Sequence, residues 1–143
     1  MEPLTIQQAL DLALEHHKAG RLPDAGNIYQ QILQRNPNQP VALHLLGVVA
    51  HQTGKNDTAV ELITKALAIK PDYVEALSNL GNELRGLGKL EEAVASCRKA
   101  LDLQPDFAEA HINLGNALQH HVSIEQDELS NQTEKELKHV AEA

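Results

Sequence analysis

Four asparagines are the residues of this 143-residue sequence whose type and spacing most clearly suggest chemistry. Asn79 and Asn82 flank a Leu-Gly pair in the segment SNLGN, and Asn113 and Asn116 take the same places in INLGN. The members of each pair are three residues apart, so on a helix they share one face. A carboxamide donates and accepts hydrogen bonds, as a peptide group does. These side chains could therefore hold the backbone of an extended polypeptide; the alternative is that they serve local hydrogen bonding and solubility.

The asparagine motif recurs because the whole chain repeats with a period of 34 residues. Pro37, Pro71 and Pro105 keep this step, as do the glycines at 20, 54 and 88 and the Leu-Gly pairs that end at 47, 81 and 115. A fixed period of this length indicates a solenoid of stacked repeats. The predicted array covers residues 1–122, with full units 6–39, 40–73 and 74–107 and a half unit 108–121.

Each unit is expected to form two antiparallel helices, A and B. In the third unit, Leu77, Leu80, Gly81 and Leu84 follow the spacing of one helical face. Gly88 can end the first helix, and Pro105 stops the second, which runs over 90–103. We expect Gly47, Gly81 and Gly115 to lie where helix A meets helix B, because the missing Cβ permits close approach.

The matching positions resemble the tetratricopeptide repeat (TPR) family. Its unit carries a Leu-Gly pair in helix A, small residues in helix B and a proline at the turn, here Leu80-Gly81, Ala93, Ala100 and Pro105. The NLGN units are also similar to those of the O-linked N-acetylglucosamine transferase superhelix, where a ladder of asparagines holds an extended polypeptide. The resemblance implies an all-α, right-handed α-solenoid whose A helices line a concave groove.

The same register selects the residues that would line this groove. They are Asn79, Asn82, Asn113, Asn116, Arg85, Gln119, His44, His51, Leu45 and Val48. Leu45 and Val48 take the asparagine positions of the second unit and would form an apolar pocket. The histidines would make binding depend on pH between about 6 and 7; the alternative is that they are solvated polar residues. Leu10, Leu14, Leu45 and Glu75 stand where chaperone-tail receptors of the family carry a Lys, Asn and Arg clamp, so we do not expect that class of ligand.

Composition narrows the class of protein. The net charge of −8 argues against a nucleic-acid or anionic-membrane partner. The longest apolar stretch has about ten residues, too few for a membrane span, and the N-terminal segment lacks signal-peptide features. We therefore expect a cytoplasmic protein with no cofactor. We also expect no metal, because the two histidines of each adjacent pair, 16–17 and 120–121, point to different faces of their helix. No catalytic constellation is present, and Cys97 falls in a core position, so we expect no enzyme.

The acidic tail, residues 123–143, departs from the repeat. Asp127, Asn131 and Glu134 stand where helix B would need apolar residues, whereas Leu129, Leu137 and Val140 permit a helix over 125–141 in another register. Repeat arrays need a polar cap over the last apolar face, and we expect this helix to be that cap. The alternative is an uncovered fourth helix A that pairs with another copy, giving a homodimer through the C-terminal end.

The sequence thus favours a non-catalytic protein–protein interaction module that binds an extended polypeptide segment in its groove. Two alternatives remain. One is a self-assembling scaffold that works through the array ends and the tail. The other is the substrate-binding part of a glycosyltransferase-like protein that lacks its catalytic domain.

Overall fold

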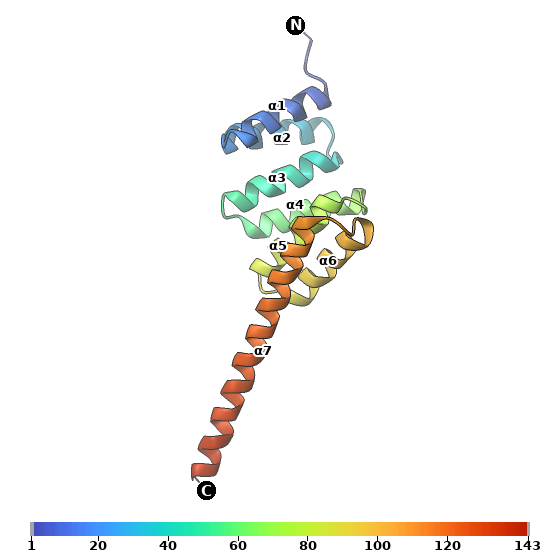
Figure 1. The fold of residues 1–143 in the computed structure, drawn as a ribbon. Helices are drawn as coiled ribbons and strands as arrows, with labels where there is room; N and C mark the ends of the chain where they lie inside the picture. The colour runs from blue at the N-terminus through green and yellow to red at the C-terminus, as the bar shows by residue number, and fades with distance from the viewer. Residues whose placement is uncertain (1, 143) are drawn as a thin grey trace.

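Seven α-helices form the computed structural model of the chain, which describes residues 2–142. In chain order they are α1 (Ile6–Lys18), α2 (Leu22–Arg35), α3 (Pro40–Gln52), α4 (Asn56–Ile69), α5 (Val74–Gly86), α6 (Leu90–Leu103) and α7 (Ala108–Glu142). The helices stack into an elongated array, and the second half of α7 projects from one end as a rod (Figure 1). The first six helices form three hairpins that match the predicted units, and residues 2–142 contain no strand. The predicted all-α solenoid is therefore confirmed.

A glycine with positive φ ends the first helix of each hairpin. Gly20, Gly54 and Gly88 have φ values of 79°, 81° and 78°, a conformation that residues with a Cβ rarely adopt. It lets the chain turn back, so that the Lys89 N–H donates to the Leu84 carbonyl at 2.9 Å. This hydrogen bond to a carbonyl five residues earlier is the Schellman type of helix ending. The position of this glycine in each repeat therefore sets the length of helix A.

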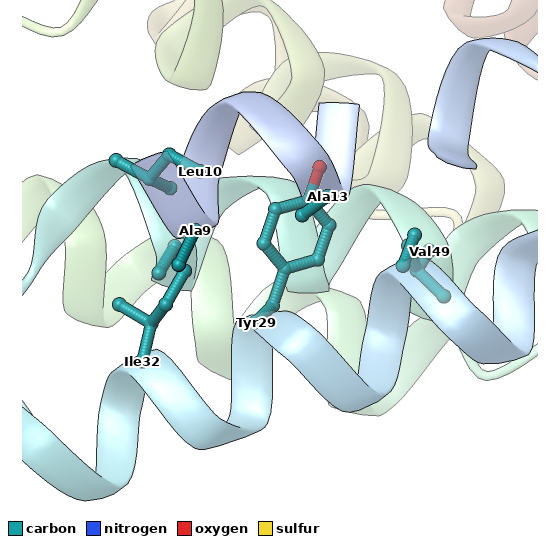
Figure 2. Close-up of a cluster of buried hydrophobic side chains, with 8 residues drawn as sticks. Ala9, Leu10, Ala13, Tyr29, Ile32 and Val49 are labelled. Carbon is teal, nitrogen blue, oxygen red and sulfur yellow. The ribbon is translucent and has the colours of Figure 1, made fainter. Parts of the chain in front are cut away.

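Small side chains make the contacts between helices. The fully buried positions are mostly alanines, and the largest side chains among them are Tyr29, Ile32 and Ile63. In the first hairpin the Tyr29 ring of α2 lies beside Ala13 of α1, with Ile32 under Ala9 (Figure 2). Val49 of α3 belongs to the same cluster, so the core continues from one hairpin into the next.

Gly47 and Gly81 lie where helix A meets helix B, as predicted. A Cβ on Gly47 would come within 2.8 Å of Ile63 Cγ1, and one on Gly81 would overlap Cys97 Sγ and come within 3.2 Å of the Ala93 carbonyl oxygen. The prediction that Gly115 lies against a helix B is wrong, because nothing lies within 4 Å of a Cβ built there. No helix B folds against α7 within the described residues.

The tail does not cap the array, and that prediction is also wrong. Residues 123–142 are helical, but they continue α7 instead of forming a separate helix, and all of them are exposed. Val122 explains this continuation. It stands one repeat after Gly88, at the position where glycine ends the earlier A helices, and a β-branched residue does not adopt positive φ. The helix therefore runs on into solvent.

Two matched glycine variants test the packing between helices A and B. Gly81→Ala should lower the free energy of unfolding by about 1 to 3 kcal/mol, because the Ala93 backbone blocks the added methyl group. Gly115→Ala is the control and should leave stability unchanged or raise it by up to about 1 kcal/mol, the helix-propensity gain. Chemical denaturation of both variants measures the difference. Equal effects would contradict the proposed role of Gly81.

Candidate functional site

Asn79 and Asn113 connect successive A helices. Asn79 Nδ2 of α5 lies 2.8 Å from His44 Nε2 of α3. One repeat later, Asn113 Nδ2 of α7 donates to Ser78 of α5, at 3.1 Å to its carbonyl oxygen and 3.0 Å to its Oγ. Both asparagines are partly exposed. Each therefore uses its amide N–H groups to stabilise the stacking of hairpins. This is the local hydrogen bonding that the sequence analysis gave as the alternative to peptide binding.

His44 is the central residue of a buried polar network. An amide nitrogen only donates, so His44 Nε2 accepts from Asn79, and the ring proton must lie on Nδ1. His44 Nδ1 is 2.9 Å from Tyr73 Oη, to which it donates. Burial lowers the pKa of His44 to about 4, although the Glu75 carboxylate opposes this shift. His44 is accordingly neutral near pH 7.

The prediction that His44 lines the groove is therefore wrong. Its side chain is only 3% exposed, because the next A helix covers it. The equivalent contact between the first two hairpins is apolar: Leu10 is buried there and Leu45 packs against its cluster. Leu45 and Val48 are both half-buried. The sequence register placed the side chains on the correct helices but did not reveal that this column lies between the repeats.

The structure brings Arg85, Asn116 and Gln119 together. They line an open pocket between α5 and α7 with His120 and Ser123. Arg85 Nη2 donates to Asn82 Oδ1 at 3.0 Å, and this bond from the same helix holds the guanidinium group in place. Of the ten predicted groove residues, Asn82 thus acts on the site through Arg85, while Asn116 and Gln119 are exposed in it.

The pocket has more hydrogen-bond donors than the protein satisfies. A guanidinium group carries five N–H donors, and Asn82 is its hydrogen-bond acceptor among the described residues. Arg85 Nε is buried without a partner in this part of the chain. None of the residues that line the pocket is an acid. The site can therefore receive backbone carbonyl oxygens or a carboxylate.

His51 contacts an acidic side chain, Glu83, that the sequence did not predict as its partner. The His51 side chain is 46% exposed, and its Nδ1 contacts Oε1 of the buried Glu83 side chain. Burial raises the pKa of Glu83, and His51 opposes the rise. The sequence does contain a hint of this contact. At the equivalent position of successive repeats it has Glu15, Val49, Glu83 and Ala117, so the acid Glu83 stands between two apolar residues.

His120 and Ser123 were missed for a different reason. The array was expected to end near 121, yet α7 continues and its period places them with Asn116, at steps of four and seven residues.

Among residues 2–142, no cluster of three His, Cys, Asp or Glu side chains could hold a metal ion. In the same part of the chain, no helix combines the length and the apolar character needed to cross a membrane.

Two family profiles match the chain, and both represent one repeat type. A profile described as tetratricopeptide repeat matches residues 16–80, and one described as TPR repeat matches residues 81–121. The matches adjoin, so together they extend from residue 16 to residue 121. No curated protein sequence matches the chain.

Solved structures with the same fold include proteins of different kinds. An O-GlcNAc transferase mutant from Thermobaculum terrenum is 34% identical with a TM-score of 0.77; the match covers 79% of this chain but 22% of the transferase. The first TPR domain of human RPAP3 is 25% identical with a TM-score of 0.79, over 85% of this chain and 95% of that domain. The first TPR of Spaghetti (RPAP3), bound to the HSP90 peptide SRMEEVD, is 24% identical with a TM-score of 0.77, over 82% and 93% of the two chains.

The buried histidine predicts how stability depends on pH. The folded pKa of about 4 lies below the ordinary value of 6.5, so the unfolded chain binds more protons in this window. Stability contributed by neutral His44 is complete above pH 6.5 and is lost as the pH falls towards 4. Lowering the pH from 7 to 5 should reduce the free energy of unfolding by about 2 kcal/mol through this residue.

A double variant isolates this contribution. His44→Leu with Asn79→Leu copies the Leu10–Leu45 contact of the first interface, and it should remove that part of the pH dependence. Urea unfolding at pH 7 and 5 compares the two proteins, while Glu83 and the other acids contribute to both. An identical pH dependence, or a His44 ring that titrates near 6.5 in an NMR experiment, would refute the assignment.

Proposed function

Because the chain belongs to the tetratricopeptide repeat family, we propose that it is a non-catalytic interaction module that holds an extended polypeptide along α3, α5 and α7. The observation that carries this proposal is the donor-rich pocket between α5 and α7. Arg85 is fixed there by Asn82 with most of its donors unused, and Asn116 and Gln119 are exposed beside it. A polypeptide offers the carbonyl oxygens that these groups lack.

Asn79 and Asn113 would contribute the complementary half of the recognition. Their Nδ2 groups are used between the repeats, but no hydrogen bond among the described residues uses their Oδ1 atoms. These oxygens are acceptors and suit the N–H groups of a peptide backbone. The asparagine column would therefore accept from the ligand, while Arg85, Asn116 and Gln119 donate to it. His51 and the half-buried Val48 would extend this surface over α3.

The ligand should differ from that of the Spaghetti domain. That domain is bound to an HSP90 peptide, whereas the clamp positions of this chain carry Leu10 and Leu45, which pack in the first core cluster. Those apolar side chains cannot hold a terminal carboxylate. The site that offers charge is Arg85, near the C-terminal end of the array.

The similarity to the transferase supports a second candidate function. The match has 34% identity over 79% of this chain. The chain would then correspond to a substrate-holding array of the kind that accompanies a transferase domain. The chemistry of the groove is the same in both functions, because each requires capture of an extended polypeptide.

Paired arginine variants test the proposed site. Peptides selected for binding to the wild-type protein from a random library would be titrated by fluorescence anisotropy. Arg85→Ala should weaken binding at least about 10-fold, because hydrogen bonds to a charged group contribute about 1.5 to 3 kcal/mol. Arg98→Ala removes an equal charge from the exposed surface of α6 and should have no effect. Equal losses in the two variants, or none, would contradict the placement of the site.

A further inference from the structure

Arg85 belongs to a column of side chains that lie between successive A helices. At the same position of each repeat, from α1 to α7, the column carries His17, His51, Arg85 and Gln119. His17 Nε2 of α1 lies 2.7 Å from Gln52 Oε1 of α3. His51 Nδ1 of α3 contacts Glu83 Oε1 of α5. At the first two interfaces, an oxygen atom of the next A helix therefore meets the side chain of this column.

The third interface lacks both of these oxygen atoms. The first contact joins residues 35 positions apart, and the second joins residues 32 positions apart. The residues 35 and 32 positions after Arg85 are His120 and Ala117. Neither side chain contains an oxygen atom. At the positions that serve the two earlier interfaces, α7 therefore offers Arg85 no acceptor.

The charge of Arg85 is consequently left without an acid. Its Nη2 donates to Asn82 of the same helix at 3.0 Å, and its Nε is buried with no partner in the part of the chain that the structure describes. Among residues 2–142, no carboxylate forms an ion pair with it. Glu83, two residues earlier on α5, lies against His51 instead. A partly buried guanidinium group without a counter-ion favours an anionic ligand.

The side chains around Arg85 can also donate hydrogen bonds. Asn116 and Gln119 each carry an amide NH₂ group, and His120 and Ser123 can each supply one N–H or O–H. All four are exposed. An ionised carboxylate only accepts hydrogen bonds and has about four acceptor sites on its two oxygens. It matches this set of donors, and it offsets the charge of Arg85, which a neutral peptide carbonyl group does not.

The net charge of −8 does not prevent an acid from entering this pocket. The acids that follow the pocket along α7, Glu125 and Asp127, are exposed and do not line it. Exposed charges are screened over about 8 Å at physiological ionic strength. The partly buried Arg85 is screened less, so the local charge of the pocket outweighs the total charge of the chain.

We propose that the donor-rich pocket binds a carboxylate of the extended polypeptide, so that the ligand carries an acid where it passes between α5 and α7. This carboxylate would give Arg85 the oxygen that Gln52 and Glu83 give to the histidines at the earlier interfaces. An Asp or Glu side chain and a C-terminal carboxyl group offer the same chemistry. The inference rests on the peptide-binding function proposed above and names the class of ligand residue that the site selects.

Changes in the ligand test this inference first. Each peptide selected from the random library would be compared with two neutral forms, one with Asn and Gln in place of Asp and Glu, and one with an amidated C-terminus. At least one form should bind the wild-type protein at least about 10-fold more weakly, and that form identifies the source of the carboxylate. With Arg85→Gln the same change should alter affinity less than about 2-fold, because the charge that it pairs with is absent.

A matched pair of variants tests the protein side. His120→Glu places a carboxylate at the position that corresponds to Gln52, where it competes with the ligand for Arg85, so it should weaken binding at least about 10-fold. His121→Glu adds the same charge one residue later and outside the pocket, and it should change affinity less than about 3-fold. Circular dichroism and thermal unfolding of both variants check that the repeats stay folded.

The outcomes distinguish this inference from the function on which it rests. Peptides that lose affinity for Arg85→Ala, but bind equally well in both neutral forms, would overturn the carboxylate assignment and leave the peptide-binding function intact. Equal effects of His120→Glu and His121→Glu would also overturn the assignment. A library that yields no binding peptide would contradict the peptide-binding function itself, and the carboxylate assignment with it.

Discussion

The structure depends on one constraint: a hairpin of two short helices buries its apolar sides only when another helix lies against them. Gly47 and Gly81 meet this constraint inside a hairpin by letting helix B approach the backbone of helix A. Ala42, Ala76 and Ala110 meet it between hairpins. The same constraint makes the ends of the array special. The first helix has Gln8 at this contact position, whereas α7 keeps the glycine, and no helix among residues 2–142 packs against Gly115.

Polar residues are divided between the interior of the array and its surface. His44, Ser78, Asn79 and Asn113 form hydrogen bonds between A helices, where apolar Leu10 and Leu45 make the same contact one interface earlier. These bonds orient the A helices and leave the Oδ1 atoms of Asn79 and Asn113 without a hydrogen-bond partner among the described residues. Arg85, Asn116 and Gln119 form few such bonds and face a pocket. Asparagine in the repeated motif thus has two roles, and the position within the motif determines which role dominates.

The period of 34 residues predicts most of the fold, because helix length, turn and hairpin contact all follow from glycine, proline and alanine at fixed steps. It also predicts which helices carry the polar residues, and Arg85, Asn116 and Gln119 do lie together. It does not predict the burial of His44, because that depends on how closely α5 approaches α3. The continuous α7 could have been foreseen from Val122, which occupies the position of a turn glycine, but the polar residues that follow favoured a broken helix in another register.

The division of the asparagines between stacking and recognition is the central claim, and NMR with a bound peptide tests it most directly. On addition of a selected peptide, the side-chain amide signals of Asn116 and Gln119 and the Arg85 Nε–H signal should shift strongly. The His44 ring, 3% exposed and held between helices, should not shift. A peptide that moves the signals of α2, α4 and α6 while those of Arg85, Asn116 and Gln119 stay unchanged would contradict the account.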